Sequence, residues 1–152
     1  MKRIAQIDEQ GCGVACVAMI AGVSYQDART ILFPDNNISS VKHPQLRSAL
    51  AHFGITLSAG RRLGKLGFDD LTQDGIIWTY VTLKTELWKH WTVWDASAQA
   101  ILDPYQGDIG KRALRLVSIF DVQRPKNLRK TRANPERADS PPTTHLRTKT
   151  SA

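Results

Sequence analysis

Apolar residues in the first part of the chain recur with helical spacing. Residues 12–21 (CGVACVAMIA) are apolar on every side and are followed by Gly22, which predicts a buried helix that ends at a glycine. A second helix is predicted after Ser24, whose hydroxyl is suited to cap it. This helix should end at Leu32 or Phe33, because a proline follows.

Two further helical segments are predicted before the pattern changes. Over residues 44–53, apolar side chains recur every three or four positions and Gly54 closes the run. A short helix or turn is predicted at residues 68–71. The first half of the chain is therefore expected to be helical.

The second half has the pattern of a sheet. Residues 76–83 (IIWTYVTL) are β-branched and aromatic on both faces, which predicts a central strand. Residues 91–94 and 100–102 are predicted to be two strands joined by a tight loop, and residues 114–122 a further strand. Helices followed by strands indicate an α+β domain, in which a helical half packs on an antiparallel sheet.

The charge is unevenly placed along the 152 residues. Of the net charge of +7, residues 124–152 carry +6, with eight Lys and Arg against two acidic residues, so residues 1–123 carry only +1. Residues 124–152 also contain four prolines and no aromatic residue, and cannot bury enough apolar area to offset their ordering entropy. We therefore predict one domain over residues 1–123 and a disordered tail over residues 124–152. A basic tail can hold nucleic acid or an acidic partner, but a solvated tail is the simpler interpretation.

Composition narrows the class of protein. Apolar residues make up 41% and charged residues 23% of the chain, which suits a globular domain. No apolar run approaches the roughly 20 residues that span a bilayer, and Gln6, Asp8 and Glu9 stand where a signal peptide would be apolar. We expect no membrane span and a cytoplasmic location. Two cysteines are too few for a disulfide scaffold, so packing or chemistry must explain them.

Cys12 is the first candidate for chemistry. It begins the predicted buried helix, where unpaired backbone N–H groups and the positive end of the helix dipole favour a thiolate. The glycines on either side of it would let a substrate backbone approach closely. Cys16 lies one turn further in and is better explained as a packed, inert thiol. Zinc bound by Cys12, Cys16 and His90 is an alternative interpretation.

A cysteine nucleophile needs a base, and His90 is the best placed of the histidines in residues 1–123, because it begins the strand HWTVW. If the following loop is centred on residues 96–97, His90 lies directly opposite Asp103, which could then orient its ring. A loop centred one residue away would break this pairing. Asp103 followed by Pro104 would then merely begin a turn.

The stretch QIDEQGCGVACVAM, with Gln6 six residues before Cys12, resembles the papain-like cysteine peptidases that cleave double-glycine leader peptides in bacteriocin processing. That family has a glutamine at this spacing before its nucleophilic cysteine, then a histidine opening an apolar strand, and then an aspartate followed by proline. HWTVW at His90 and ILDPYQG at Asp103 match in order. The resemblance covers about residues 4–122.

This resemblance implies a papain-like fold with Cys12, His90 and Asp103 as a catalytic triad and no metal or organic cofactor. Gln6 and the backbone N–H of Cys12 would form the oxyanion hole. Gly11 departs from the family, which usually has an acidic residue there. Such peptidases occur as domains of ABC exporters and as stand-alone relatives. The printed sequence has no Walker motif and no membrane region, which predicts a stand-alone peptidase and removes the usual reason to expect a double-glycine leader as substrate.

The leading hypothesis is a cysteine peptidase that acts on a peptide or protein substrate. Two alternatives stay open: the same triad could transfer an acyl group or deamidate a side chain, or the chain could be a catalytically silent peptide-binding module. The four tryptophans, at positions 78, 88, 91 and 94, are expected to be mostly core. Trp91, beside His90, is the one expected to shield the catalytic pair or line a substrate groove.

Overall fold

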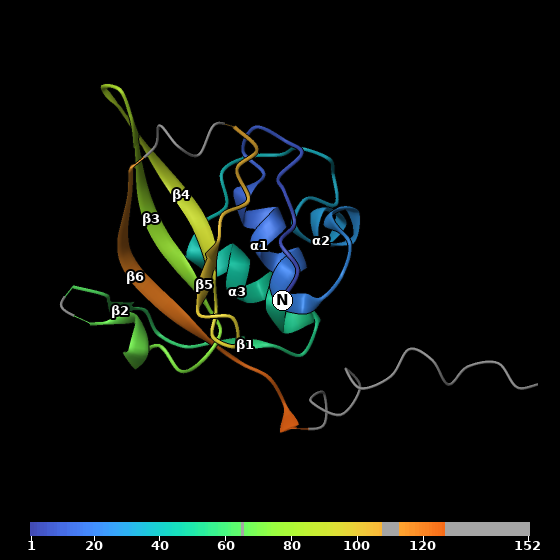
Figure 1. The fold of residues 1–152 in the computed structure, drawn as a ribbon. Helices are drawn as coiled ribbons and strands as arrows, with labels where there is room; N and C mark the ends of the chain where they lie inside the picture. The colour runs from blue at the N-terminus through green and yellow to red at the C-terminus, as the bar shows by residue number, and fades with distance from the viewer. Residues whose placement is uncertain (65, 108–112, 127–152) are drawn as a thin grey trace, which may run out of the picture.

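The computed structural model describes residues 1–64, 66–107 and 113–126 of the chain. Three helices lie on one side of an antiparallel sheet (Figure 1), which confirms the predicted α+β architecture. Residues 127–152 lie outside the described residues, so the disordered tail stays a prediction. Arg124, which the sequence assigns to that tail, contacts the body through Asp74 Oδ2 at 2.8 Å and the carbonyl of Ile20 at 3.0 Å.

The three helices match their predicted ranges to within one residue. Helix α1 (Cys12–Ala21) is buried from Gly13 to Ile20 and ends at Gly22, whose φ of 70° needs glycine. Helix α2 (Tyr25–Leu32) is capped by the Ser24 hydroxyl, which accepts a hydrogen bond from Asp27 N at 3.0 Å. Helix α3 (His43–His52) carries a proline in its first turn.

The sheet is built around two long hairpin strands. Strand β3 (Gly75–Leu83) is central, as predicted, and pairs with β4 (Glu86–Asp95) on one side and β6 (Ala113–Gln123) on the other. The order is β1-β6-β3-β4-β5, with β5 (Ala100–Leu102) at one edge and β1 (Thr56–Leu57) at the other. A two-residue β2 (Arg61–Arg62) also pairs with β6, and a short 3-10 helix, η1 (Phe68–Asp70), follows it.

The register between β4 and β5 differs from the prediction. Asp95 pairs with Ala100 and Val93 with Leu102, so the loop is centred one residue further along than residues 96–97. The reason is the Asp95 side chain, whose Oδ1 accepts hydrogen bonds from Ser97 and Ala98 and widens the turn. Moving the centre by one residue changes each partner by two, which keeps the same side chains on the same face. His90 and Asp103 are therefore not directly opposite in this register, as expected for a loop centred one residue away, but their side chains share a face and are joined by a hydrogen bond.

Helix α1 lies at the centre of the core. It packs against β4, α2 and α3, and contributes Val14, Val17 and Ile20 to the larger apolar cluster. A smaller cluster around Ile77 and Trp94 covers the other side of the sheet. The segment that carries Cys12 is therefore held rigidly against the strand that carries His90.

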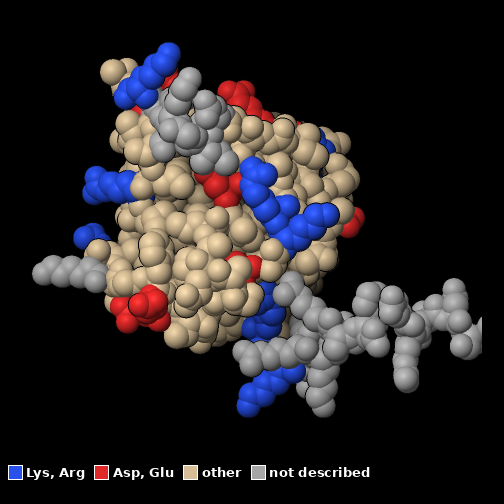
Figure 2. All heavy atoms as spheres, in the orientation of Figure 1, with Lys and Arg blue, Asp and Glu red and all other residues tan. Residues whose placement is uncertain are grey.

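Figure 2 shows how the charged side chains are distributed over one face of the molecule. On the face in Figure 2, the coloured Lys and Arg side chains lie in small separate groups among uncharged ones. No helix in the described part of the chain is long and apolar enough to cross a membrane.

Candidate active site

Cys12 is the first residue of α1 and is partly exposed. The residue before it, Gly11, offers no side chain to cap the helix, so the first-turn N–H groups beside the thiol have no side-chain acceptor from that position. A Cβ on Gly13 would lie 2.7 Å from Val41 Cβ, so glycine there lets the loop before α3 pack against α1. The thiol therefore stands at the positive end of a buried helix, which favours an anion.

His90 stands between Asp103 and Cys12. Its Nε2–H donates to Asp103 Oδ1 at 2.7 Å, and both residues are only 7% exposed. Burial by itself would lower the pKa of His90, but the hydrogen bond to Asp103, the hydrogen bond to Cys12 and the charges of both partners raise that pKa to about 9. Since Nε2 is bonded to Asp103, Nδ1 is the ring nitrogen that remains for the thiol. The structure thus brings together the three residues predicted as a triad.

Asp103 is fixed from several directions. It follows the last residue of β5, and its Oδ1 also accepts from Tyr105 N at 2.9 Å. The Arg3 guanidinium donates to the carbonyls of Asp103 and Tyr105, at 2.5 and 2.6 Å. Gln6 N donates to the carbonyl of Pro104 at 2.8 Å. The N-terminal segment therefore holds the aspartate in place for His90.

Gln6 lies near the thiol, but its side-chain amide is hydrogen-bonded to carbonyls of its own loop. It lines the same cavity as Cys12 and His90. Its Nε2 donates to the carbonyls of Glu9 at 2.9 Å and Asp8 at 3.2 Å. Its Oε1 is buried and, within the described part of the chain, has no hydrogen-bond partner. An oxyanion role for Gln6 stays a prediction, because its N–H groups would first have to leave those carbonyls.

The loop between Gln6 and Cys12 is anchored to α2. The hydroxyl of Tyr25 donates to Asp8 Oδ2 at 2.8 Å and accepts from Asp8 N at 3.2 Å, and Arg29 Nε donates to the same carboxylate oxygen at 3.2 Å. A Cβ on Gly11 would lie 2.0 Å from the Tyr25 hydroxyl and 2.9 Å from the Asp8 carbonyl. The glycine that departs from the family pattern is therefore the residue that this anchor requires.

Cys16 has a different environment from Cys12. Its side chain is completely buried in the core. Burial, followed by the charges of Cys12 and Asp103, raises the pKa of Cys16 well above its ordinary value. A thiol in this state is unreactive at neutral pH. Within the described residues, no group of three or more His, Cys, Asp or Glu side chains is arranged to hold a metal ion.

A cavity of about 630 Å³ opens over Cys12 and His90. Its walls come from the loop before α1, the loop before α3, the β3–β4 hairpin and the segment after β5. The lining residues are Gln6, Glu9, Gln10, Cys12, Ser40, Val81, Leu87, Trp88, Lys89, His90 and Tyr105. A volume of this size is typical of a site that binds part of a peptide or a small molecule.

Trp91, the tryptophan expected to line a substrate groove, does not line the Cys12 cavity. Trp91 is 4% exposed, and its Nε1 donates to the Val41 carbonyl at 2.8 Å, so it belongs to the core and to a neighbouring cavity of about 380 Å³. Trp88, at 37% exposure, lines the Cys12 cavity instead. Sequence reasoning also missed Tyr105 and Ser40 as wall residues. Alternation along β4 could have indicated Trp88, because it lies two residues from His90.

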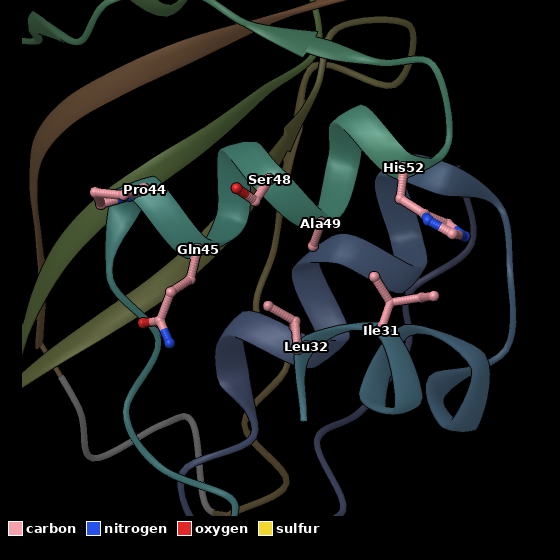
Figure 3. A pocket seen from close by; sticks show the side chains of 7 residues that line it. All are labelled: Ile31, Leu32, Pro44, Gln45, Ser48, Ala49 and His52. Atoms are coloured by element: carbon pink, nitrogen blue, oxygen red, sulfur yellow. The ribbon is translucent and has the colours of Figure 1, made fainter. Parts of the chain in front are cut away.

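A third cavity, of about 360 Å³, lies between the end of α2 and one face of α3 (Figure 3). It is lined by Ile31, Leu32, Pro44, Gln45, Ser48, Ala49 and His52. It shares no residue with the Cys12 cavity. The residues predicted as a triad therefore take no part in lining this third cavity.

No family model and no curated protein matches the chain. Among solved structures, the chain is similar to a double glycine motif protease from an AMS/PCAT transporter, whose crystal structure is in complex with the leader peptide. The identity is 18%, the match covers 82% of this chain and 91% of that chain, and the TM-score is 0.48. At this level of likeness, the chemistry of the site has to be inferred from the geometry of this chain.

Proposed function

We propose that this protein is a papain-like cysteine peptidase that cleaves a peptide bond with Cys12 as nucleophile, His90 as base and Asp103 as the group that orients His90. The observation that carries the proposal is the position of His90, whose Nε2 is hydrogen-bonded to Asp103 and whose ring lies close enough to Cys12 for the thiol to raise its pKa. A buried histidine whose pKa is about 9 supports a stable imidazolium beside a thiolate.

The reaction follows from these positions. His90 takes the proton of Cys12, and the thiolate forms a bond to the carbonyl carbon of the substrate. When the tetrahedral intermediate collapses, the C–N bond breaks and His90 gives its proton to the leaving amine. Water then attacks the thioester while His90 accepts its proton, which releases the acid and restores the thiol. Asp103 keeps Nδ1 turned towards Cys12 throughout.

The oxyanion of both steps needs donors near Cys12. The backbone N–H of Cys12, at the free end of α1, is one such donor. Gln6 would be the other, once its amide has turned from the carbonyls of Asp8 and Glu9 to the substrate. Hydrogen bonds of this kind are commonly incomplete before substrate binds. The substrate class that we propose is a peptide or protein, of which a leader peptide of the double-glycine type is one member.

The test is digestion of a peptide library by the full chain and by Cys12→Ala, with the products identified by mass spectrometry. The proposal expects new termini that appear with the wild type and not with the variant. Glutamine converted to glutamate at a Cys12-dependent site, without new termini, would instead establish a deamidase. Absence of any Cys12-dependent product would overturn the enzymatic assignment.

A silent peptide-binding module is the second candidate, and the engaged amide of Gln6 is the observation that favours it. Such a module would bind library peptides without changing them. Peptides that Cys12→Ala retains, and that the wild type cuts, would exclude this candidate. Peptides that both proteins retain intact would support it.

A further inference from the structure

The segment before α1 and the segment after β5 lie side by side, although about a hundred residues separate them in the sequence (Figure 1). Residues 3–6 and 103–106 belong to no helix or strand of the described chain, so regular secondary structure does not hold them together. Hydrogen bonds from both segments join them instead. One segment carries Gln6, the proposed oxyanion residue, and the other carries Asp103, which orients His90.

The Arg3 guanidinium bonds to the carbonyls on both sides of Pro104. Its Nε donates to the carbonyl of Asp103 at 2.5 Å, and its Nη2 donates to the carbonyl of Tyr105 at 2.6 Å. A planar guanidinium presents its N–H donors in fixed directions, so it fixes the relative position of two acceptors better than an ammonium group does. The backbone of Asp103 is therefore held in the orientation that places its carboxylate 2.7 Å from His90 Nε2.

The backbone and the side chain of Gln6 are held by different segments. Its N–H donates to the carbonyl of Pro104 at 2.8 Å, and its own carbonyl accepts from Gln106 Nε2 at 2.8 Å. Its side-chain amide instead donates to the carbonyls of Asp8 and Glu9. Rotation about the side-chain bonds of Gln6 can therefore release the amide while the backbone stays attached to the segment after β5.

We propose that Gln106 is a positioning residue for Gln6. Arg3 is its counterpart for Asp103, so the two sides of the active site depend on one shared support. This inference rests on the proposed peptidase function. Neither Arg3 nor Gln106 is among the described residues that line the Cys12 cavity, so each acts through another residue and not by touching substrate there. Both side chains are exposed, so replacing them should cost little stability.

Gln106→Met keeps the length of the side chain and removes the donor to the Gln6 carbonyl. The substrate is a library peptide that the wild type cuts and Cys12→Ala does not. The variant should lower kcat about 3- to 10-fold with KM nearly unchanged, because Gln6 no longer presents its amide from a fixed backbone. In Gln6→Ala, the same substitution should have almost no further effect on kcat. Gln73→Met, at an exposed glutamine before β3, is the control and should leave kcat unchanged.

Two results would overturn the role of Gln106. One is a kcat that Gln106→Met leaves at the level of the wild type. The other is an equal fold-loss of kcat in the wild type and in Gln6→Ala. Such a loss would not pass through Gln6, and it would mean that Gln106 supports the structure alone.

The role of Arg3 is tested by the pH dependence of kcat/KM. Because the pKa of His90 is raised to about 9, kcat/KM should fall as pH rises through about 9 in the wild type. Arg3→Met releases the turn that carries Asp103, so the fall should move to lower pH, and Arg3→Lys should move it less. Lys2→Met is the control for the lost charge. Loss of a positive charge alone would raise the pKa of His90 and move the fall to higher pH.

The other titratable groups around His90 stay in place in these variants. They are Glu9 in the loop before α1, Cys12 at the start of α1, Lys89 on β4, and Asp103 and Tyr105 after β5. A move to lower pH in Arg3→Met that is absent in Lys2→Met therefore reports the position of Asp103.

The remaining outcomes separate this inference from the proposed function. A fall at the same pH in Arg3→Met and the wild type, or the same shift in Lys2→Met, would overturn the role of Arg3. If circular dichroism shows that Arg3→Met is unfolded, Arg3→Lys decides, and an unmoved fall in that variant counts against the role. If peptides are cut but no variant differs from its control, only the inference fails. If no peptide is cut in a Cys12-dependent way, the proposed function fails and the inference fails with it.

Discussion

The groups on the two sides of Cys12 differ in whether they are positioned for the proposed reaction. On one side, His90 and Asp103 are joined by a hydrogen bond of 2.7 Å and the ring also contacts the thiol. On the other side, Gln6 reaches the cavity but donates its N–H groups to the backbone of its own loop. The groups that we propose to generate the nucleophile are in place, whereas the group expected to stabilise the oxyanion is not.

The difference follows from what supports each side. His90 lies in a strand paired along its length with β3, and Asp103 is held by the N-terminal segment. The backbone of Gln6 is bonded to Pro104 and Gln106, but its side chain lies at the start of an irregular loop that is anchored to α2 through Asp8 and Tyr25. A loop with few buried contacts changes conformation at lower cost than a sheet does. We therefore expect substrate to complete the oxyanion side and to leave the base side unchanged.

The largest effect is expected on the base side. His90→Ala should lower kcat/KM for a cleaved peptide by about 10⁴-fold, because both proton transfers lose their carrier. His52→Ala is a matched control, since His52 is an exposed histidine on α3, and it should leave kcat/KM unchanged. Similar losses in both variants would mean that His90 has no special role.

The next largest effect is expected for Gln6, the residue proposed to stabilise the oxyanion. Gln6→Ala should lower kcat by about 10²- to 10³-fold, because one oxyanion donor is lost, with a smaller change in KM. Alkylation of Cys12 by iodoacetamide should keep its rate, since that reaction forms no oxyanion. Gln26→Ala, on the exposed side of α2, is the control. An unchanged kcat would show that Gln6 stays bound to its loop and takes no part in catalysis.

A smaller effect is expected in the pH dependence. Because the pKa of His90 is raised to about 9, kcat/KM should fall as pH rises through about 9. Asp103→Asn removes the main group that raises this pKa, so the fall should move to lower pH. A descending limb at the same pH in both proteins would contradict the role given to Asp103.

The raised pKa of His90 also predicts that the free energy of unfolding depends on pH. A histidine pKa raised from 6.5 to about 9 in the folded state stabilises the fold fully below pH 6.5, and this contribution is lost as pH rises through about 9. The free energy of unfolding should fall by on the order of 3 kcal/mol over that interval. Urea titrations should show a smaller fall for Asp103→Asn than for the wild type.

The smallest effect concerns the anchor of the loop. Gly11→Ala places a Cβ 2.0 Å from the Tyr25 hydroxyl, so it should destabilise the fold by about 1–3 kcal/mol and lower kcat. Removing that hydroxyl in Gly11→Ala with Tyr25→Phe should recover part of kcat. No recovery would mean that the clash with the Asp8 carbonyl, at 2.9 Å, decides the effect.

Local features of the fold were predictable from the sequence. The apolar run that ends at Gly22 and the cap at Ser24 determine α1 and α2 through contacts within a few residues. Strands β1 and β2 were missed because they have two residues each and depend on pairing with β6. The first half of β4 was missed because its side chains are polar or exposed, with no apolar run to indicate it.

The sequence indicated which residues lie together at the candidate site, but not the strand register or the hydrogen-bond partners that position them. Contact between His90 and Asp103 was expected from a register that proved wrong by two residues, and it survives because strand side chains alternate with a period of two. The partners of the Gln6 amide depend on the path of its loop, which no spacing indicates. Trp88 was passed over for Trp91 because the exposure of each depends on which elements cover its face of β4, and the local sequence does not indicate this.

The most direct measurement is the labelling of the purified chain with a thiol-directed amide-hydrolase probe, with the modified cysteine located by mass spectrometry. Wild type is compared with Cys12→Ala, Cys16→Ala and His90→Ala. We predict rapid labelling that disappears in Cys12→Ala, slows greatly in His90→Ala and persists in Cys16→Ala. Labelling at Cys16, or a slow rate that His90→Ala leaves unchanged, would contradict it.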